Sequence, residues 1–271
     1  MVTLSARRAK NSRVTQGLGR AGMACYGLVH VIVAYLAARV AFGDTGEQAD
    51  QTGAVQEVGS GTFGAVVLWV LAVGLVAYGV WQVMQATVGY QWIRKTSRRT
   101  RRRAGAAVKA VIGVTLGIYA GRLASGNGSG GSGDQQQQEF TATLLALPAG
   151  QVLVGIVAAV VVGVGVGQVR NGVKKSFLDD LDIHDLPRGT RQWVRRLGVV
   201  GYIAKGVVIG IVGVLLGLAA FQHNSREAGG LDRALKTLAA QPFGTVALAV
   251  VAIGLAAFGV YCFAAARAHK T

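Results

Sequence analysis

The chain repeats one pattern three times: an apolar segment, a loop, and a second apolar segment that opens with a small or aromatic residue followed by glycine. The three openings are Phe63-Gly64, Ala149-Gly150 and Phe243-Gly244, and glycine recurs fifteen positions after each, at Gly79, Gly165 and Gly259. The preceding segments align too, since a glycine lies five residues before each of Gly27, Ala110 and Gly206. A fixed internal period is typical of one supersecondary unit in several copies. The pattern therefore predicts a helical hairpin that occurs three times.

The apolar segments are long enough to cross a membrane. The 271 residues are 52% hydrophobic and 15% charged, yet the formal net charge is +16, as expected when apolar spans alternate with basic loops. About twenty residues of helix fit a hydrocarbon core roughly 30 Å thick. Six such windows are Ala21 to Phe42, Phe63 to Gln85, Ala104 to Ala124, Leu147 to Gln168, Leu197 to Phe221 and Phe243 to Ala266. We predict an all-α polytopic membrane protein with six transmembrane helices, built as three repeated hairpins in a pseudo-threefold arrangement.

These windows divide the chain into repeats and connections. The three repeats cover residues 21–90, 104–172 and 197–266. A basic arm, 1–20, precedes the repeats, and a short tail, 267–271, follows them. The repeats are connected by a basic loop, 91–103, and by a longer loop, 173–196. The first span is roughly twice as long as the apolar core of a signal peptide, so we expect it to remain in the protein.

Basic residues predict one orientation of the spans. They gather in the arm 1–20 and in the loops 91–103 and 173–196, whereas the segments 43–62 and 125–146 contain no Lys or Arg. The third loop on that side is a mild exception, with Arg226, Arg233 and Lys236. By the positive-inside rule, both termini are predicted to be cytoplasmic in a plasma (inner) membrane. Because Cys25 and Cys262 then lie toward a reducing compartment, we expect no disulfide.

The loops on the opposite side differ in character. The second, from Ser125 to Gln138, is rich in Gly, Ser and Gln, so we expect it to be mobile and a poor place for a rigid site. Helical spacing in 54–58, 144–147 and 231–240 predicts short interfacial helices. In the last of them, Leu231, Leu235 and Leu238 would share one face.

Glycine is abundant, with 40 residues in the chain. Lipid tails are as apolar as leucine, so helices in a membrane associate through close backbone contact, which small residues permit. We therefore predict that most of these glycines pack helices. A nucleotide-binding interpretation lacks the lysine of a phosphate-binding loop. For Gly163, Gly165 and Gly167 the alternative is a break in the helix, as transporters use at their sites.

Few polar side chains fall inside the spans. His30 lies within the first span, one turn beyond Tyr26, and an ionisable group in a membrane is a functional candidate because its burial is costly. The alternative is a neutral imidazole bonded to a neighbouring hydroxyl or carbonyl. Together with Tyr119 of the third span, His30 and Tyr26 are the candidate polar intramembrane residues.

Basic residues at the span ends are candidate contacts for anionic lipids. Lys109 and Lys205 occupy the repeat position of Tyr26, near the cytoplasmic ends, where a long side chain can reach the headgroups. Arg39 and Arg122 are repeat equivalents near the outer ends, and they are candidates for binding an anionic headgroup or a polyprenyl phosphate. The densest set directly precedes the third span and comprises Arg98, Arg99, Arg101, Arg102 and Arg103. Beside a span, such a run favours anionic lipid over nucleic acid, for which neither interleaved aromatics nor a binding fold is evident.

The polar residues do not form a recognisable catalytic set. Neither a Ser, His and Asp arrangement nor a Cys and His pair stands out, and His223 is the sole candidate base on the outer side. The spans also offer too few nitrogen, sulfur and oxygen ligands for a metal site. We therefore expect a protein without enzymatic activity, cofactor or metal.

Several motifs of the repeats resemble a known family. The third repeat reads Gly-Tyr-Ile-Ala-Lys-Gly from Gly201 and Ala-Ile-Gly-Leu-Ala-Ala-Phe-Gly-Val-Tyr from Ala252, and the first has Ala-Val-Gly-Leu-Val-Ala-Tyr-Gly-Val-Trp from Ala72. The middle copy keeps Pro-Ala-Gly from Pro148 but departs at the later positions. Over nearly its whole length the chain resembles the bacterial family catalogued as domain of unknown function 1206. The resemblance implies a multi-pass membrane protein, found mainly in actinobacteria, with three two-helix repeats and no assigned activity.

Three functions agree with these patterns to different degrees. The leading one is a membrane accessory or scaffold protein whose basic cytoplasmic face engages anionic lipids or a membrane-protein partner. The first alternative is a small transporter or channel with a pathway along the pseudo-threefold axis, lined by His30, Tyr26, Thr115 and Tyr119, although the repeats are not inverted. The second is an enzyme that acts on lipid at the outer face through Arg39 and Arg122.

Overall fold

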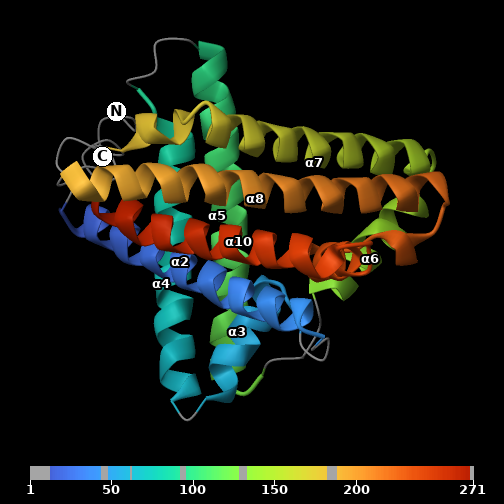
Figure 1. Cartoon of the computed structure of the whole chain (residues 1–271), viewed down its shortest axis with the longest axis horizontal. Coiled ribbons are helices and arrows are strands. Elements are labelled where there is room, and N and C mark those ends of the chain that lie inside the picture. Colours follow the sequence, from blue (N-terminus) through green and yellow to red (C-terminus); the bar gives the residue numbers. More distant parts are fainter. Residues whose placement is uncertain are drawn as a thin grey trace. The chain divides into compact units, whose positions relative to one another are not determined.

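The computed structural model of the protein describes residues 13–43, 48–61, 63–91, 96–127, 133–181 and 188–268, and the regular elements in these ranges are helices (Figure 1). Residues 1–12 of the predicted basic arm, 92–95 of the basic loop and 269–271 of the tail lie outside the described residues. The chain order is α2 (Arg13–Ala41), α3 (Gln51–Ser60), α4 (Gly64–Val88), α5 (Thr96–Ala124), α6 (Gly133–Leu145), α7 (Gly150–Val173), η1 (Ser176–Asp180), α8 (Arg188–Phe221), η3 (Ser225–Glu227), α9 (Leu231–Ala239) and α10 (Gly244–Ala268).

Six of these helices contain the predicted spans. The segments that are long and apolar enough to cross a membrane are Gly19–Ala41, Gly64–Val88, Arg99–Ala124, Gly150–Val173, Gly189–Phe221 and Gly244–Ala268. They confirm the all-helical class and indicate a multi-pass membrane protein. Three helices begin earlier than predicted: α2 begins at Arg13, inside the predicted arm, and α5 begins at Thr96 and α8 at Arg188, inside the segments expected to be loops. Helical propensity explains the difference, because Arg and Gln favour helix and these segments contain no proline after Pro187.

The helices gather into two compact units that do not follow the repeat boundaries. One unit takes its described residues from Met1–Leu28, Val55–Ser129 and Cys262–Thr271, and the other from Val29–Ala54 and Gly130–Tyr261. We call them unit 1 and unit 2. The first therefore contains α4 and α5, and the second contains α6 to α9, while α2, α3 and α10 contribute to both. Because the predicted pseudo-threefold arrangement relates helices of both units, it stays a prediction.

Glycine lets the two spans of one repeat approach closely. In unit 1, a Cβ atom at Gly22 would lie 2.6 Å from the backbone nitrogen and the Cβ of Tyr78. In unit 2, a Cβ atom at Gly201 would lie 2.6 Å from Cα and 2.7 Å from Cβ of Phe258. These two contacts involve equivalent positions of repeats 1 and 3, so the alignment read from the sequence corresponds to the same packing in both copies.

Glycine also packs each repeat against the next one. A Cβ atom at Gly79 would lie 2.6 Å from Cγ2 of Val114, and one at Gly165 would lie 2.8 Å from the backbone nitrogen of Gly210. The pairs α4 with α5 and α7 with α8 therefore form tight contacts, and in unit 2 α7 runs beside α8 (Figure 1). At Gly79 and Gly165, the repeated glycine fifteen positions into the second span is needed because a backbone lies against it.

The helix break considered for α7 does not occur. This helix continues without interruption through Gly163, Gly165 and Gly167. The first and last of these glycines face open space, since no heavy atom lies within 4 Å of a Cβ built there. The alternating glycines therefore reflect packing at Gly165 alone.

Each repeat places a short helix between its two spans, and we call α3, α6 and α9 the loop helices. The short helices predicted in 54–58 and 231–240 are confirmed, whereas the one predicted in 144–147 begins earlier and covers Gly133–Leu145. The opening glycine of each second span is required at this junction. A Cβ atom at Gly64, Gly150 or Gly244 would collide with backbone atoms of the preceding loop helix or of the residue that ends it. Those openings in the sequence thus mark where a loop helix turns into a span.

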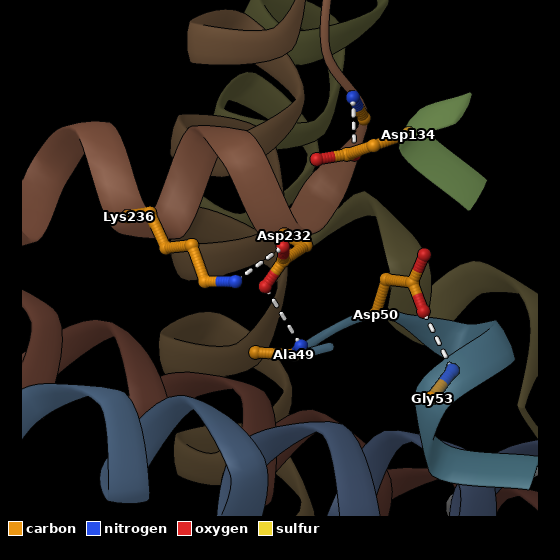
Figure 2. Close-up of polar contacts among 7 residues, drawn as sticks. Ala49, Asp50, Gly53, Asp134, Asp232 and Lys236 are labelled. Atoms are coloured by element: carbon orange, nitrogen blue, oxygen red, sulfur yellow. Dashed lines mark hydrogen bonds and ion pairs between the residues drawn. The ribbon is translucent and has the colours of Figure 1, made fainter. Parts of the chain in front are cut away.

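Aspartates connect the loop helices of unit 2 (Figure 2). The carboxylate of Asp232 accepts a hydrogen bond from the backbone nitrogen of Ala49 at 2.9 Å, and its other oxygen lies 2.8 Å from Nζ of Lys236. The carboxylate of Asp134 accepts from the backbone nitrogen of Gly230 at 2.7 Å. Asp50 caps the start of α3 by accepting from the backbone nitrogen of Gly53 at 2.7 Å. Asp232 and Asp134 therefore connect the loop segments of the three repeats at this end of unit 2, whereas Asp50 caps its own helix.

The part of the second loop from Gly133 onward is more ordered than the sequence predicts. We expected residues 125–138 to be mobile, but α6 begins at Gly133, and Gln137 donates a hydrogen bond to the carbonyl of Gly229 at 2.9 Å. Composition alone misses this order because Asp134 and Gln137 find their partners about ninety residues away. Burial raises the pKa of Asp134, and the nearby carboxylate of Asp232 raises it further. The pKa of Asp50 is also raised, chiefly by burial and additionally by Asp134 and Asp232.

Candidate functional site

A contact between two ionisable side chains inside the spans joins α2 and α8 in unit 2. Nζ of Lys205 lies 3.2 Å from Nε2 of His30, although 175 positions separate the two residues in the chain. His30 is almost completely buried, with 3% of its surface exposed, whereas Lys205 is half-buried. An ammonium group can only donate, so the imidazole nitrogen that faces it acts as the acceptor. The geometry therefore favours a neutral imidazole beside a charged lysine.

Phe258 on α10 completes this arrangement. Its ring lies 4.3 Å from Nζ of Lys205, as in a cation–π contact, and the ring centroids of Phe258 and His30 are 4.9 Å apart. Further aromatic rings of unit 2 continue from Phe258, with Tyr202 at 5.3 Å and Tyr261 at 6.1 Å between centroids. We call Lys205, His30 and Phe258 the cationic site. It stands in an aromatic environment.

Phe177 extends the aromatic environment from a segment that the sequence treats as loop. It belongs to η1, is fully buried, stacks on Tyr202 at 5.0 Å and meets Tyr261 edge-on at 5.3 Å. Gly198 leaves the room for its ring, because a Cβ atom there would collide with it. Sequence reasoning missed Phe177. Its signal was a lone aromatic residue inside a basic and acidic loop.

The equivalent position in unit 1 has no cation. Tyr26 and Tyr78 stand where repeat 3 has Lys205 and Phe258, and their rings stack with centroids 4.9 Å apart and planes 15° apart. The hydroxyl of Tyr78 accepts a hydrogen bond from Nε2 of Gln82 at 2.7 Å. Gln85, one turn further, is fully buried, and its amide has no hydrogen-bond partner within the described ranges. The candidate Tyr26 is therefore part of a buried aromatic pair.

The candidate Tyr119 lies toward the C-terminal end of α5. Its hydroxyl accepts a hydrogen bond from Nε2 of Gln56 on the loop helix α3 at 2.7 Å. This contact ties a loop helix to a span. Tyr119 therefore has a structural partner in unit 1, while its predicted role in a polar pathway stays a prediction.

The other basic candidates differ in their surroundings. The ammonium of Lys205 contacts His30 and Phe258, and its predicted contact with an anionic headgroup stays a prediction. Lys109, its equivalent in repeat 2, is half-buried on α5. The guanidinium of Arg39 lies over the ring of Tyr35, with 5.9 Å to the centroid, whereas Arg122 is exposed. Arg39 belongs to unit 2 and Arg122 to unit 1, so their joint binding of an anion stays a prediction.

The basic run before the third span forms the first turns of α5. Arg101 is exposed there, and Arg99 and Arg102 are half-buried. Arg103 has a structural role, because its Nε and Nη2 lie 3.3 Å and 3.2 Å from the carbonyl oxygen of Gly89, just after the end of α4. A cation at this position donates hydrogen bonds to a carbonyl after the last turn of α4 and complements the negative end of the helix dipole. Arg98 lies on the same helix, but its side chain is outside the described part.

Helix α8 repeats this feature. Its first turns carry Arg191, Arg195 and Arg196, of which the last two are exposed, and Trp193 beside them exposes 64% of its surface. In both α5 and α8 the basic turns continue without a break into the apolar span. We call these turns the basic ends of α5 and α8. Amphipathic Trp next to Arg is typical of residues that lie at a membrane surface.

Comparisons with known proteins agree with the repeats. The family model described as Domain of Unknown Function (DUF1206) matches three segments of the chain, 21–89, 104–175 and 200–269. The uncharacterized protein YxxB of Bacillus subtilis (strain 168) is 29% identical over 243 residues, which cover 90% of this chain and 87% of the relative. No solved structure matches the chain with significant similarity. The three matched segments coincide with the three repeats, which confirms the resemblance drawn from the motifs.

Proposed function

We propose, for a chain that belongs to the family described as Domain of Unknown Function (DUF1206), that the protein binds anionic lipids at the basic ends of α5 and α8. In this proposal it acts without catalysis, as an accessory or scaffold protein that holds such lipids or a membrane-protein partner beside it. The proposal places the protein in the plasma membrane with both termini cytoplasmic, where the leaflet is rich in anionic lipid.

The observation that carries the proposal is the continuity of each basic end with its span. Because α5 and α8 are single helices, the guanidinium groups of their first turns are held at the point where the apolar segment begins. Exposed Arg101, Arg195 and Arg196 can reach phosphate groups there. Each Lys or Arg near an anionic surface contributes about 1 kcal/mol of attraction, so several together give useful affinity.

The test compares an exposed arginine of a basic end with an exposed arginine at the opposite end. Arg101→Gln and Arg226→Gln remove the same charge from α5 and from η3 respectively. We expect the first variant, purified in nanodiscs of phosphatidylglycerol and phosphatidylcholine, to retain fewer phosphatidylglycerol molecules in native mass spectrometry, and the second to match wild type. Combining Arg99→Gln, Arg101→Gln and Arg102→Gln should enlarge the loss. Equal lipid retention in all variants contradicts the proposal.

A second candidate function is supported by the cationic site. Polar groups such as Lys205 and His30 inside spans are typical of transport pathways in membrane proteins. A small transporter or channel would therefore use this pair, and flux of its solute in proteoliposomes should fall when His30 is replaced by Ala. A flux that is unchanged in His30→Ala argues against this mechanism.

A further inference from the structure

We propose that the amide side chains of Gln82 and Gln85 bind one ordered water molecule inside unit 1, near the end of α4. Both residues lie in the last turns of a span, on the face of α4 that is buried. The ligand class is a neutral molecule that donates and accepts hydrogen bonds at the same time. Lipid binding at the basic ends of α5 and α8 does not depend on this water, so the inference goes beyond the proposed function.

Three amide atoms of this pair have no hydrogen-bond partner among the described residues. Nε2 of Gln82 donates to the hydroxyl of Tyr78 at 2.7 Å, but Oε1 of Gln82 is unpaired there. Both Oε1 and Nε2 of Gln85 are unpaired as well. Gln85 is fully buried and Gln82 exposes 2% of its surface, so lipid headgroups do not reach these atoms. Buried polar groups are almost always paired, and ordered water is the partner where the protein supplies none.

The two glutamines face inward although the outer face of α4 is apolar. On the buried face, Leu71 and Leu75 precede the polar residues, so this face changes from apolar to polar toward the end of the span. On the other side, Val80 and Val83 expose about half of their surfaces. Helix α4 thus turns valines outward and amides inward, the reverse of a helix at the surface of a soluble protein. An amide turned inward from a membrane needs its polar partner inside the protein.

Water fits the unpaired atoms better than an ion does. Side chains three positions apart on a helix are neighbours, with about 5–6 Å between their Cβ atoms, so one molecule can contact both amides. A water molecule can donate to Oε1 of Gln82 and of Gln85 and accept from Nε2 of Gln85, which gives the roughly three hydrogen bonds of a typical buried water. A metal cation would leave the Nε2 donor unpaired, and an anion would leave both oxygens unpaired. The pattern of two acceptors and one donor group therefore selects water.

Neighbouring helices pack against α4 on both sides of the amides. One turn before the first amide, Gly22 of α2 lies against Tyr78, since a Cβ atom at this glycine would be 2.6 Å from the backbone nitrogen of the tyrosine. One turn after the second amide, Arg103 of α5 bonds the carbonyl of Gly89. The unpaired atoms therefore lie in a section of α4 that is enclosed at both ends, where a bound water stays ordered.

The other repeats provide contrasts at the same positions. Three and six positions after the aligned glycines, repeat 1 has Gln82 and Gln85, repeat 2 has Gln168 and Asn171, and repeat 3 has Cys262 and Ala265. The amides of repeat 2 are half-buried, and the residues of repeat 3 are buried but are not amides. A pair of fully enclosed amides is therefore specific to repeat 1. Gln168 serves as the matched amide that is partly exposed.

The experiment detects the water directly on the full chain. The protein, with isotope-labelled glutamine and leucine, is reconstituted in vesicles of phosphatidylglycerol and phosphatidylcholine, and solid-state NMR measures how fast magnetisation passes from water to each nitrogen. The side-chain signal of Gln85 is identified by its loss in Gln85→Met. A bound water lies within hydrogen-bond distance of Nε2, so we expect transfer to Gln85 at least about fivefold faster than to the backbone nitrogen of buried Leu75. Transfer to Gln85 as slow as to Leu75 overturns the inference.

A second arm tests whether the amides hold the water. A short X-ray pulse splits water, and the radicals formed modify the side chains beside it. Tyr78 should be modified although it is buried, and the modification should fall by about fivefold or more in Gln85→Met, which removes two of the three partners of the water. Tyr261 is buried to a similar degree in unit 2 and should stay nearly unmodified in both proteins. Equal modification of Tyr78 and Tyr261, or modification of Tyr78 that persists in Gln85→Met, overturns the inference.

Two further variants protect the result against a folding defect. Gln85→Leu also removes the amide and replaces Gln85→Met if that variant does not fold, and it should lose the modification of Tyr78 as well. Gln168→Met removes an amide from the position of repeat 2 that is equivalent to Gln82, and it should leave the modification of Tyr78 unchanged. An equal loss in Gln168→Met and Gln85→Met would reflect a general change of the protein and contradicts a water held by Gln82 and Gln85.

Discussion

Repeats 1 and 3 use the same backbone contact to hold different chemistry. In unit 1, Gly22 lies against Tyr78, and Tyr26 stacks on that tyrosine. In unit 2, Gly201 lies against Phe258, and Lys205 places its ammonium over that ring. The close backbone approach is common to both copies. The side chains one turn further along differ, from a pair of aromatic rings to a cation with a histidine beside it.

The difference shows which part of a repeated hairpin is free to change. A glycine in a helix contact cannot become larger without moving a backbone, so both copies keep it. The neighbouring positions only need side chains of similar bulk, and Tyr, Phe and the long stem of Lys all fill such space. A polar site can therefore arise in one repeat while the others remain structural.

The largest expected effect tests the shared backbone contact. Gly22→Val and Gly201→Val should each destabilise the protein by about 3 kcal/mol, because overpacking at a backbone contact cannot be relieved by rotating a side chain. Unfolding in increasing SDS, followed by circular dichroism, measures the change. Gly163→Ala is the control, and it should be neutral or stabilise by about 0.5–1 kcal/mol since its surroundings are open. Sensitivity in one copy alone would break the comparison.

The hydrogen bond between Gln82 and Tyr78 in unit 1 provides the next test. Tyr78→Phe removes the acceptor of the hydrogen bond from Gln82 and leaves a buried amide unpaired, which should cost about 1–3 kcal/mol. Tyr35→Phe removes a hydroxyl from a side chain that is 55% exposed and should change the free energy of unfolding by less than about 0.5 kcal/mol. The same SDS titration reads both. Equal effects would show that the hydroxyl of Tyr78 has no special role.

The cation–π contact between Lys205 and Phe258 in unit 2 should contribute less to the free energy of unfolding. Phe258→Leu keeps an apolar side chain but removes the ring below Lys205, so we expect a loss of about 1–2 kcal/mol. In a Lys205→Met background, Phe258→Leu should cost less than it does in wild type, because the contact between Lys205 and Phe258 is already absent. A double-mutant cycle from thermal unfolding tests this coupling. Strictly additive effects contradict a direct interaction.

The cap at the end of α4 should have a smaller effect, confined to unit 1. Arg103→Gln removes the guanidinium that bonds the carbonyl of Gly89 and should cost about 0.5–1 kcal/mol. Arg101→Gln, two residues earlier on the same helix, removes an exposed charge and should leave the unfolding curve unchanged. This pair separates a structural arginine from one proposed to bind lipid. If Arg101→Gln destabilises as much as Arg103→Gln, the distinction is wrong.

The smallest effect is expected from pH and belongs to unit 2. The raised pKa of Asp50 means that the folded state takes up a proton more readily than the unfolded chain. Its charged form therefore destabilises the loop helices above the raised pKa, and stability increases as pH falls through that value. The gain is complete below the ordinary pKa of about 3.9. Hydrogen exchange of α6 and α9, corrected for intrinsic rates, should slow as pH falls through the raised pKa of Asp50.

Asp50→Asn provides the control for this pH effect. The substituted amide keeps a hydrogen-bond acceptor for Gly53 but no longer titrates, so most of the pH dependence should disappear. What remains should come from Asp134, whose pKa is also raised by burial. Peptides of α4 and α5 in unit 1 should not respond in either protein. An equal response in both units would remove the contrast between them.

Much of the fold could be predicted because its signals are local. Six apolar segments of span length, the recurring glycines and the basic loops are all visible within short windows, and the helices confirm them. Even the opening Phe-Gly and Ala-Gly pairs correspond to one structural event, the turn from a loop helix into a span. Where prediction failed, as at the starts of α5 and α8, basic residues were interpreted as loop although they favour helix.

By itself, the sequence determined the number of spans, their order, the three-fold repetition and the positions where only glycine fits, because these depend on residues that are near one another along the chain. Only the tertiary structure decided that His30 meets Lys205, and that Asp232 holds the backbone of Ala49 across 183 positions. Such pairs depend on how each helix is rotated about its axis and which neighbour it packs against. No short window of residues carries that information, since a rotation of one helix by a fraction of a turn would give each polar side chain a different partner.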